Sequence, residues 1–255
     1  MCNPASFVLT KDKVFFSLKS ESHQDIIEEN NLHADGVRGA NILACEISPL
    51  NGDLSSDPET WEFHVDEHYP VPEWFDAERD ETRARSALKN WYAQKVITSG
   101  SREVRDQQIW VFGNSRVVAY GNSSVVAYDS SSVVAYDSSS VEAHDSSSVV
   151  AYGNSRVVAR GSSSVEAHNS SSVKACGSSS VVACGSSSVK AYGNSRVVAR
   201  GSSSVVAYGN SRVVARGSST INVCSLHVST TNSDKSVVID RVKNRITVVD
   251  NSLTF

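Results

Sequence analysis

An eight-residue repeat in the middle of the chain predicts a regular β-solenoid, preceded by a small α+β domain and followed by a short β-cap. Three observations support this fold class. Ser, Val and Ala recur without a break at three alternate positions of the repeat, and Gly, Asp or Asn follows each such run. On both sides the repeat gives way to sequence of mixed composition. We therefore place the α+β domain at residues 1–106, the solenoid at 107–223 and the C-terminal segment at 224–255.

The overall composition favours a soluble protein of the cytoplasm. The 255 residues, with a net charge of −4, allow one or two domains. There is no run of 18 apolar residues and no basic-then-apolar N-terminus, so we expect neither a membrane span nor a secretory signal. The five cysteines lack CxxC pairs, which argues against a disulfide framework or a zinc site.

Residues 1–106 carry 11 basic and 20 acidic residues, a net charge of −9, and have alternating helix and strand signals. Apolar runs predict a hairpin of residues 7–10 and 14–18, and further strands at 40–48 and 60–65. Ser22 stands three residues before Asp25 and predicts the start of a short helix. A long helix is expected after Pro72, with Trp74 and Leu88 on its apolar side.

The octads follow the pattern S-x-V-x-A-x-[GDN]-[NS], with thirteen copies whose serines run from Ser115 to Ser211. Fixed and variable positions alternate with a period of two, which is the period of a β-strand. We therefore expect Ser, Val and Ala to point inward and the variable residues to point outward. Gly, Asp or Asn tolerates positive φ and supplies the corner.

Two coil sizes are compatible with the octad. A coil of two octads would be flat, and a coil of three octads would be triangular. The small inward residues indicate a thin interior, so we favour two octads per coil. The thirteen octads and their two looser flanks then form about seven coils, which stack at the strand spacing. In that coil Tyr120, Tyr136 and Tyr152 stack on one face, with Arg200 and Arg216 further along it.

Tandem octads paired into 16-residue coils resemble the solenoid of bacterial ice-nucleation proteins. The wording GNSRVVAYGNSSVVA is similar to octapeptide-repeat proteins encoded by bacteriophages and prophages. These resemblances cover residues 107–223. They imply a solenoid fold and a phage or mobile-element origin. Ice binding is disfavoured, because Thr is absent from all thirteen octads.

The outward side chains are the candidate binding residues. Tyrosines and arginines suit contacts with proteins, and arginine with aromatic residues also suits nucleic acid. The later octads are basic, whereas Asp129, Asp137, Glu142 and Asp145 make the early octads acidic. The candidate residues are Tyr120, Tyr136, Tyr152, Arg156, Arg160, Arg196, Arg200, Arg212 and Arg216.

Two motifs in residues 1–106 bear on catalysis. His64 and His68 fit the H-x-x-E-H pattern of inverted zinc proteases, but that site needs a helix, and His64 lies in a predicted strand followed by two prolines. Cys2 before a first strand resembles the start of N-terminal-nucleophile hydrolases and class II amidotransferases, which would make it the nucleophile. Asn3 stands where those families usually have Gly.

A non-catalytic binding or scaffold protein with a host protein as its partner is the function that we expect, and the sequence gives no reason to expect a cofactor. The alternatives are an enzyme that uses Cys2 and a nucleic-acid binder that uses the arginine-rich half. Because open solenoid ends invite strand pairing, we expect residues 1–106 to cover one end. Residues 224–255 are expected to cover the other end or to form a dimer contact.

Overall fold

The computed structural model describes residues 5–32, 41–66 and 70–248, and divides the chain into two compact units, Met1–Ile97 and Thr98–Phe255. Each unit is described by itself. The solenoid unit begins before the first octad, because chain from Ser101 onward already pairs with the octad strands.

The first unit is an antiparallel sheet with a helix against each of its faces. The strand order is β2-β1-β3-β4. Phe7 of β1 packs against Phe16 and Phe63 on one face, and Phe16 in turn contacts Trp91 of α2. The next residue, Val8, belongs to the other face, where it clusters with Ile26 of α1. The elements of this unit are β1 Ser6–Leu9, β2 Val14–Phe16, α1 His23–Glu29, β3 Leu43–Ser48, two short 3-10 turns at Leu50–Gly52 and Pro58–Thr60, β4 Glu62–Val65, α2 Ala77–Lys95 and β5 Val96–Ile97.

Both predicted helices are present, and their starts are set by side-chain caps. The Ser22 side chain accepts from the amide of Asp25, as the sequence indicates. The long helix begins later than expected, at Ala77, because the Asp76 side chain accepts from the amide of Arg79 and so fixes the first turn there. Trp74 therefore precedes the helix and is not part of its apolar side.

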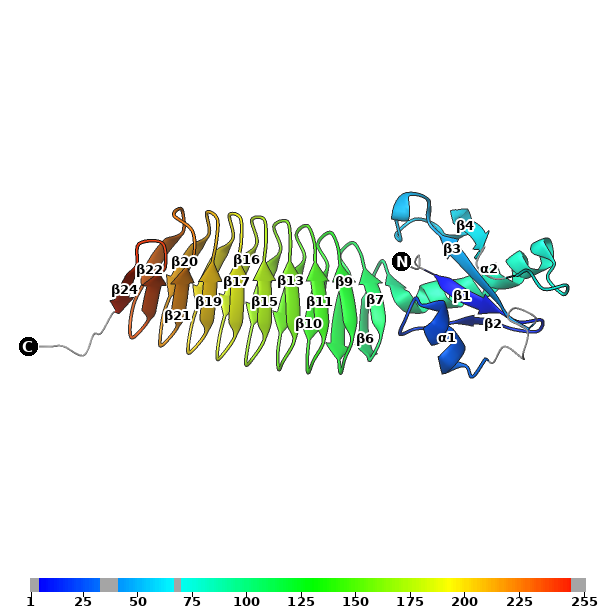
Figure 1. Ribbon diagram of the computed structural model, residues 1–255, viewed down its shortest axis with the longest axis horizontal. Helices are drawn as coiled ribbons and strands as arrows, with labels where there is room; N and C mark the ends of the chain where they lie inside the picture. The colour runs from blue at the N-terminus through cyan, green and yellow to red at the C-terminus, as the bar shows by residue number, and fades with distance from the viewer. Residues whose placement is uncertain (1–4, 33–40, 67–69, 249–255) are drawn as a thin grey trace, which may run out of the picture. The chain divides into compact units, whose positions relative to one another are not determined.

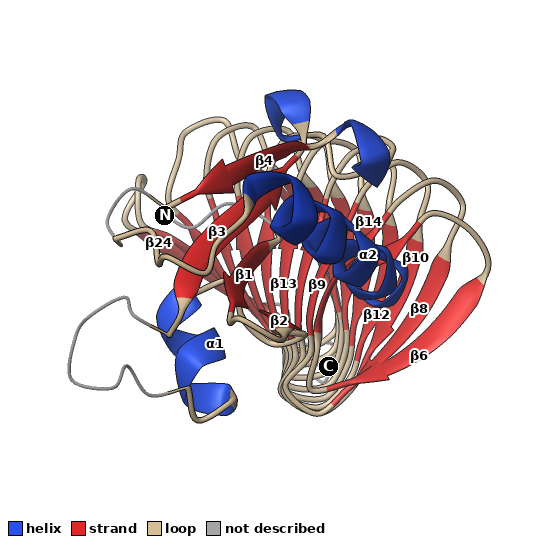
Figure 2. Ribbon diagram, turned by 90° about the vertical axis from the view of Figure 1, so that its right-hand side faces the viewer, coloured by secondary structure: helices blue, strands red, loops and turns tan. Residues whose placement is uncertain are grey.

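The second unit is a β-solenoid with two octads in each coil (Figure 1), because every octad strand pairs in parallel with the strand two octads further along, as Ser148 does with Ser164. Its strands form two parallel sheets, which we call the even sheet (β6, β8 and onward to β22) and the odd sheet (β7, β9 and onward to β23, with β24 added). Figure 2 looks along the stack and shows the two rows of strands with the corners between them. The strands are β6 Ser101–Arg105, β7 Gln108–Val111, β8 Arg116–Tyr120, β9 Ser124–Ala127, β10 Ser132–Ala135, β11 Ser140–Ala143, β12 Ser148–Ala151, β13 Arg156–Ala159, β14 Ser164–Ala167, β15 Ser172–Ala175, β16 Ser180–Ala183, β17 Ser188–Ala191, β18 Arg196–Ala199, β19 Ser204–Ala207, β20 Arg212–Ala215, β21 Thr220–Val223, β22 Ser229–Asn232, β23 Val237–Asp240 and β24 Arg245–Val248.

The inward triad of each octad forms the core. In the octad of Ser147, for example, Ser147, Val149 and Ala151 are all buried, whereas Val150 between them is only half-buried. The Ser147 hydroxyl donates to the backbone carbonyl of His144 across the corner, at 2.6 Å. The Ser147 hydroxyl is therefore satisfied locally, and the prediction that Ser, Val and Ala point inward is confirmed.

Each corner requires a left-handed backbone. Gly177 has a φ of +69°, and a Cβ there would lie 2.9 Å from the carbonyl oxygen of Gly161 in the preceding coil. Asp137, at an equivalent corner, has a φ of 59°. The Gly, Asp or Asn requirement that the sequence indicates is therefore a requirement for positive φ.

The stack is longer than the octads alone predict. Nine strands form the even sheet, so the expectation of about seven coils was too low. Flanking segments join with shifted register: the pairing of Ser101 with Arg116 spans slightly less than two octads, and the pairing of Arg212 with Ser229 spans slightly more. At the C-terminal end β24 pairs antiparallel with β23 and covers its outer edge, which is the predicted β-cap.

Candidate binding faces of the solenoid

Side chains that follow the inward alanines stack into two columns, one at a margin of each sheet. We call the column on the even sheet the even ladder, and it begins with Tyr120, Tyr136, Tyr152 and His168. The successive ring centroids lie 5.2, 5.1 and 4.9 Å apart, and the ring planes are within 14° of parallel. Each ring is half-buried. The three predicted tyrosines are thus brought together in one ordered row; Cys184, Arg200 and Arg216 continue the column.

The odd ladder is the corresponding column on the odd sheet. It starts with Phe112, Tyr128 and His144, whose ring centroids are 4.9 and 4.8 Å apart. Further along, Tyr192 and Tyr208 stack at 4.9 Å. The members of the odd ladder are Phe112, Tyr128, His144, Arg160, Cys176, Tyr192, Tyr208 and Cys224.

The six predicted arginines are divided between the two sheets. Arg196 and Arg212 are register partners on the even sheet, and Arg200 and Arg216 follow on the same two strands. Arg156 and Arg160 are on the odd sheet, in β13 and just after it. Tyr192 and Tyr208 also lie on the odd sheet, so they are not next to Arg196, Arg200, Arg212 or Arg216.

Arg160 already has a partner within the chain. Its Nε donates to Glu142 at 2.7 Å, and Glu142 is also 3.4 Å from Nε2 of His144. The odd sheet therefore neutralises this arginine by a diagonal ion pair between neighbouring coils.

Aspartates of the early octads are used by the backbone. The Asp129 and Asp137 carboxylates accept from the corner amides of Gly113 and Gly121 in the preceding coil, each at 2.9 Å. Asp234 does the same for Gly217 at 3.1 Å. Some of the acidic residues of the early octads therefore link the corners of adjacent coils.

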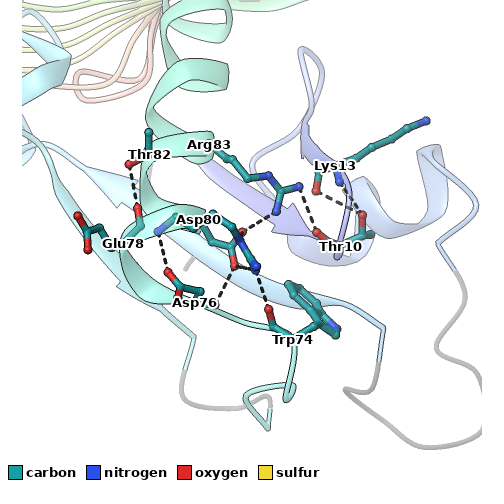
Figure 3. Close-up of polar contacts among 9 residues, drawn as sticks. Thr10, Lys13, Trp74, Asp76, Glu78, Asp80, Thr82 and Arg83 are labelled. Atoms are coloured by element: carbon teal, nitrogen blue, oxygen red, sulfur yellow. Dashed lines mark hydrogen bonds and ion pairs between the residues drawn. The ribbon is translucent and has the colours of Figure 1, made fainter.

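In the first unit, a fully buried carboxylate is held by two arginines. Asp80 lies 2.7 Å from Arg79 and 2.5 Å from Arg83, and accepts from the amide of Asp76 at 3.0 Å (Figure 3). Burial acts to raise the pKa of Asp80, but the bonds from Arg79, Asp76 and Arg83 outweigh it, and the net pKa is lowered. Arg79 also donates to the carbonyl of Trp74 and Arg83 to that of Thr10, so the cluster ties α2 to two other segments.

Two further buried polar groups have structural partners. The Lys95 side chain is fully buried, 2.9 Å from Glu21, and burial lowers its pKa. His23 contacts the backbone carbonyl of Cys45 through Nε2 at 3.0 Å, while burial raises the pKa of the Cys45 thiol well above its ordinary range. None of these three clusters was predicted from the sequence. Only the i,i+3 spacing of Asp80 and Arg83 on a helix was a signal for one of them.

A pocket of about 570 Å³ in the first unit is lined mainly by Pro58, Leu88 and Tyr92. The charged groups beside it are engaged with each other: Lys89 lies 2.8 Å from Glu59. This pocket brings together no nucleophile with a base.

Of the candidate catalytic and zinc-binding residues Cys2, His64 and His68, the structure describes only His64. His64 lies in strand β4, 3.5 Å from Glu62, and not on a helix as the zinc-protease motif requires. His68 and Cys2 lie outside the described residues. In the described part of the chain no three His, Cys, Asp or Glu side chains are grouped to hold a metal ion.

No helix among residues 5–32, 41–66 and 70–248 is long and apolar enough to cross a membrane. No protein-family model, no curated protein and no solved structure matches this chain. The candidate site is therefore defined by the geometry of the two sheet faces.

Proposed function

We propose that this protein is a non-catalytic binding scaffold whose solenoid holds a partner protein through the even ladder. The observation that supports it most strongly is the row Tyr120–Tyr136–Tyr152–His168. Tyrosine is enriched in the residues that dominate protein interfaces, because it presents a large amphipathic surface with few rotatable bonds.

Stacking favours binding by ordering these side chains before a partner arrives. Tyr136 and Tyr152 are each held between two rings at about the strand spacing, and Tyr120 and His168 each stack on one ring, so their rotamers are already restricted in the free protein. Ordering interface side chains costs about 0.5–1.5 kcal/mol each, and a pre-stacked row avoids much of that cost. The rings are only half-buried, so part of each ring remains accessible to a partner.

The nature of the partner rests on the sequence resemblance. Octads similar to those of phage and prophage proteins support a phage or mobile-element origin, and a host protein is then the partner that we propose. The N-terminal unit is proposed to act as a structural module, since its buried charges hold its own elements together.

The test compares bacterial-lysate proteins captured by three full-length baits: the wild type, Tyr120→Ser/Tyr136→Ser/Tyr152→Ser, and Tyr128→Ser/Tyr192→Ser/Tyr208→Ser on the odd ladder. Both variants remove three tyrosines. We expect mass spectrometry to detect a protein on the wild type and the odd-ladder variant that is absent from the even-ladder variant. Equal capture by all three baits would rule out the even ladder as the contact surface.

A further inference from the structure

Near the C-terminal end of the even sheet lie four arginines for which the described residues supply no partner. Arg196 and Arg200 flank Val198 on β18, and Arg212 and Arg216 flank Val214 on β20. All four arginines are exposed. Within the described residues none of them is in an ion pair or a side-chain hydrogen bond. We call these four residues the arginine grid.

The grid places like charges side by side. Arg196 and Arg212 are register partners in adjacent parallel strands, which lie about 4.8 Å apart. The amide of Arg216 bonds to the carbonyl of Ala199 at 2.9 Å, which keeps Arg200 and Arg216 in the same relation. Like charges directly opposite each other destabilise a sheet, so this arrangement favours an anion that lies against both members of a pair.

Among the described residues, no carboxylate on this face offsets the charge. The outward residues of the flanking strands are Ser180 and Val182 on β16 and Ser229 and Thr231 on β22, all within the described chain. Asp234, at the adjoining corner, is bonded to the amide of Gly217. The contrast with Arg160, which has Glu142 as its partner, shows that the same solenoid pairs an arginine elsewhere.

The geometry points to a site for the phosphate backbone of double-stranded nucleic acid. Each arginine pair can fork onto one phosphate, because guanidinium groups bind phosphate oxygens bidentately. The two pairs are four positions apart along the strands, about 13 Å, so each pair contacts a different phosphate. A ligand with phosphates at repeated intervals is therefore required.

The face favours a duplex over a single strand. No aromatic side chain lies on the even sheet from β16 to β22, all of which is described, so unpaired bases would have nothing to stack on. Contacts limited to phosphates carry no sequence information. We expect binding that is independent of sequence. This inference is separate from the proposed protein partner, which uses the aromatic part of the even ladder, Tyr120 to His168, at the other end of the same sheet.

The test is fluorescence anisotropy of full-length protein with a labelled short duplex of mixed sequence and with one of its strands alone. Two phosphate contacts, one for each arginine pair, predict a log–log salt slope of about −1.8, or about a 12-fold loss of duplex affinity between 50 and 200 mM salt. The grid variant changes Arg196, Arg200, Arg212 and Arg216 to Gln. The matched control changes Arg156, Arg160, Lys174 and Lys190 on the odd sheet to Gln, with the same loss of charge.

We expect the grid variant to lose the salt-sensitive affinity and the control to keep its slope within about half a unit. Circular dichroism checks that both variants are folded. If the grid variant does not fold, Arg196→Gln/Arg212→Gln alone replaces it and is expected to reduce the slope by about one. Equal losses in grid and control variants would overturn the site in favour of diffuse attraction. Tighter binding of the single strand than of the duplex would also overturn the site, as would a lack of duplex binding by the wild type at about 50 mM salt.

Discussion

Replacing Val149 and Val150 separately by Ala tests which face of the strand forms the core. The two residues are neighbours on β12, so the substitution and the local backbone are the same. Val149 is 1% exposed and stacks between Val133 and Val165 of adjacent coils. Val150 points to the opposite face and is only half-buried.

The magnitude for Val149→Ala follows from the two methyl groups removed. Their transfer to water accounts for about 1.6 kcal/mol. A residual cavity of about 50 Å³ adds about 1.2 kcal/mol if the two sheets do not move together. Because some collapse is expected, the loss in the free energy of unfolding should be about 2–3 kcal/mol. Val150→Ala leaves no cavity and should cost less than about 1 kcal/mol.

Thermal unfolding followed by far-ultraviolet circular dichroism measures the difference. For a unit of this size 1 kcal/mol corresponds to about 2–4 °C in Tm. We therefore expect Val149→Ala to lower the solenoid transition by about 5–10 °C and Val150→Ala by about 3 °C or less. Equal shifts, or a larger shift for Val150→Ala, would refute the assignment of inward and outward positions.

Three further predictions concern individual side chains. Asp80→Asn removes a buried charge from its arginine partners and should lower the free energy of unfolding, measured in urea at pH 7, by about 3–5 kcal/mol. The pKa of Asp80 is lowered from 3.8 in the folded protein, so the carboxylate contributes its full stability above pH 3.8. The difference from wild type should vanish as the pH falls through the folded-state pKa. A difference that persists at the lowest pH would contradict this. Gly177→Ala should lower Tm more than Gly100→Ala. Both glycines have positive φ, but only at Gly177 would the new Cβ meet a neighbouring carbonyl, at 2.9 Å. Equal effects on Tm would argue against close contact between coils. Cys45, buried and with a raised pKa, should resist iodoacetamide in the folded protein at pH 8 while half-buried Cys176 reacts, as mass spectrometry would show, and rapid labelling of Cys45 would contradict its placement.

The solenoid could be predicted from the sequence because its local and repeat-level signals agree. The period of two assigns inward and outward faces, and the obligatory Gly, Asp or Asn marks each corner, so two-octad coils follow from the small size of Ser, Val and Ala. The stacked tyrosines Tyr120, Tyr136 and Tyr152 were predictable for the same reason, since positions two octads apart must become neighbours.

The ends of the stack were less predictable, because the strands within Ser101–Arg105 and Ser229–Asp240 join the stack without having the octad sequence pattern. Their register shifts depend on packing and not on a repeat. The buried pair of Lys95 and Glu21 was not predictable for a related reason, since the partners are far apart in sequence and meet only in the folded unit.

The division of the arginines between the sheets required the three-dimensional register. In the sequence Arg156, Arg160, Arg196 and Arg200 occur in two copies of the same octad wording. They lie on opposite sheets because they are separated by an odd number of octads. Only the structure shows that Arg160 has a carboxylate partner and that the described residues offer none to the arginine grid.

Cysteine cross-linking tests most directly whether each coil contains two octads. It is made in a variant whose native cysteines are replaced by Ser. Ser148→Cys with Ser164→Cys joins register partners in adjacent strands, whose Cα atoms lie about 4.8 Å apart, within disulfide range. Ser148→Cys with Ser172→Cys joins positions three octads apart, which here lie on opposite sheets. On mild oxidation, mass spectrometry should show a disulfide in the first variant and free thiols in the second. A disulfide in the second variant and none in the first would indicate three-octad coils, and the ladders and the arginine grid would then not exist as described.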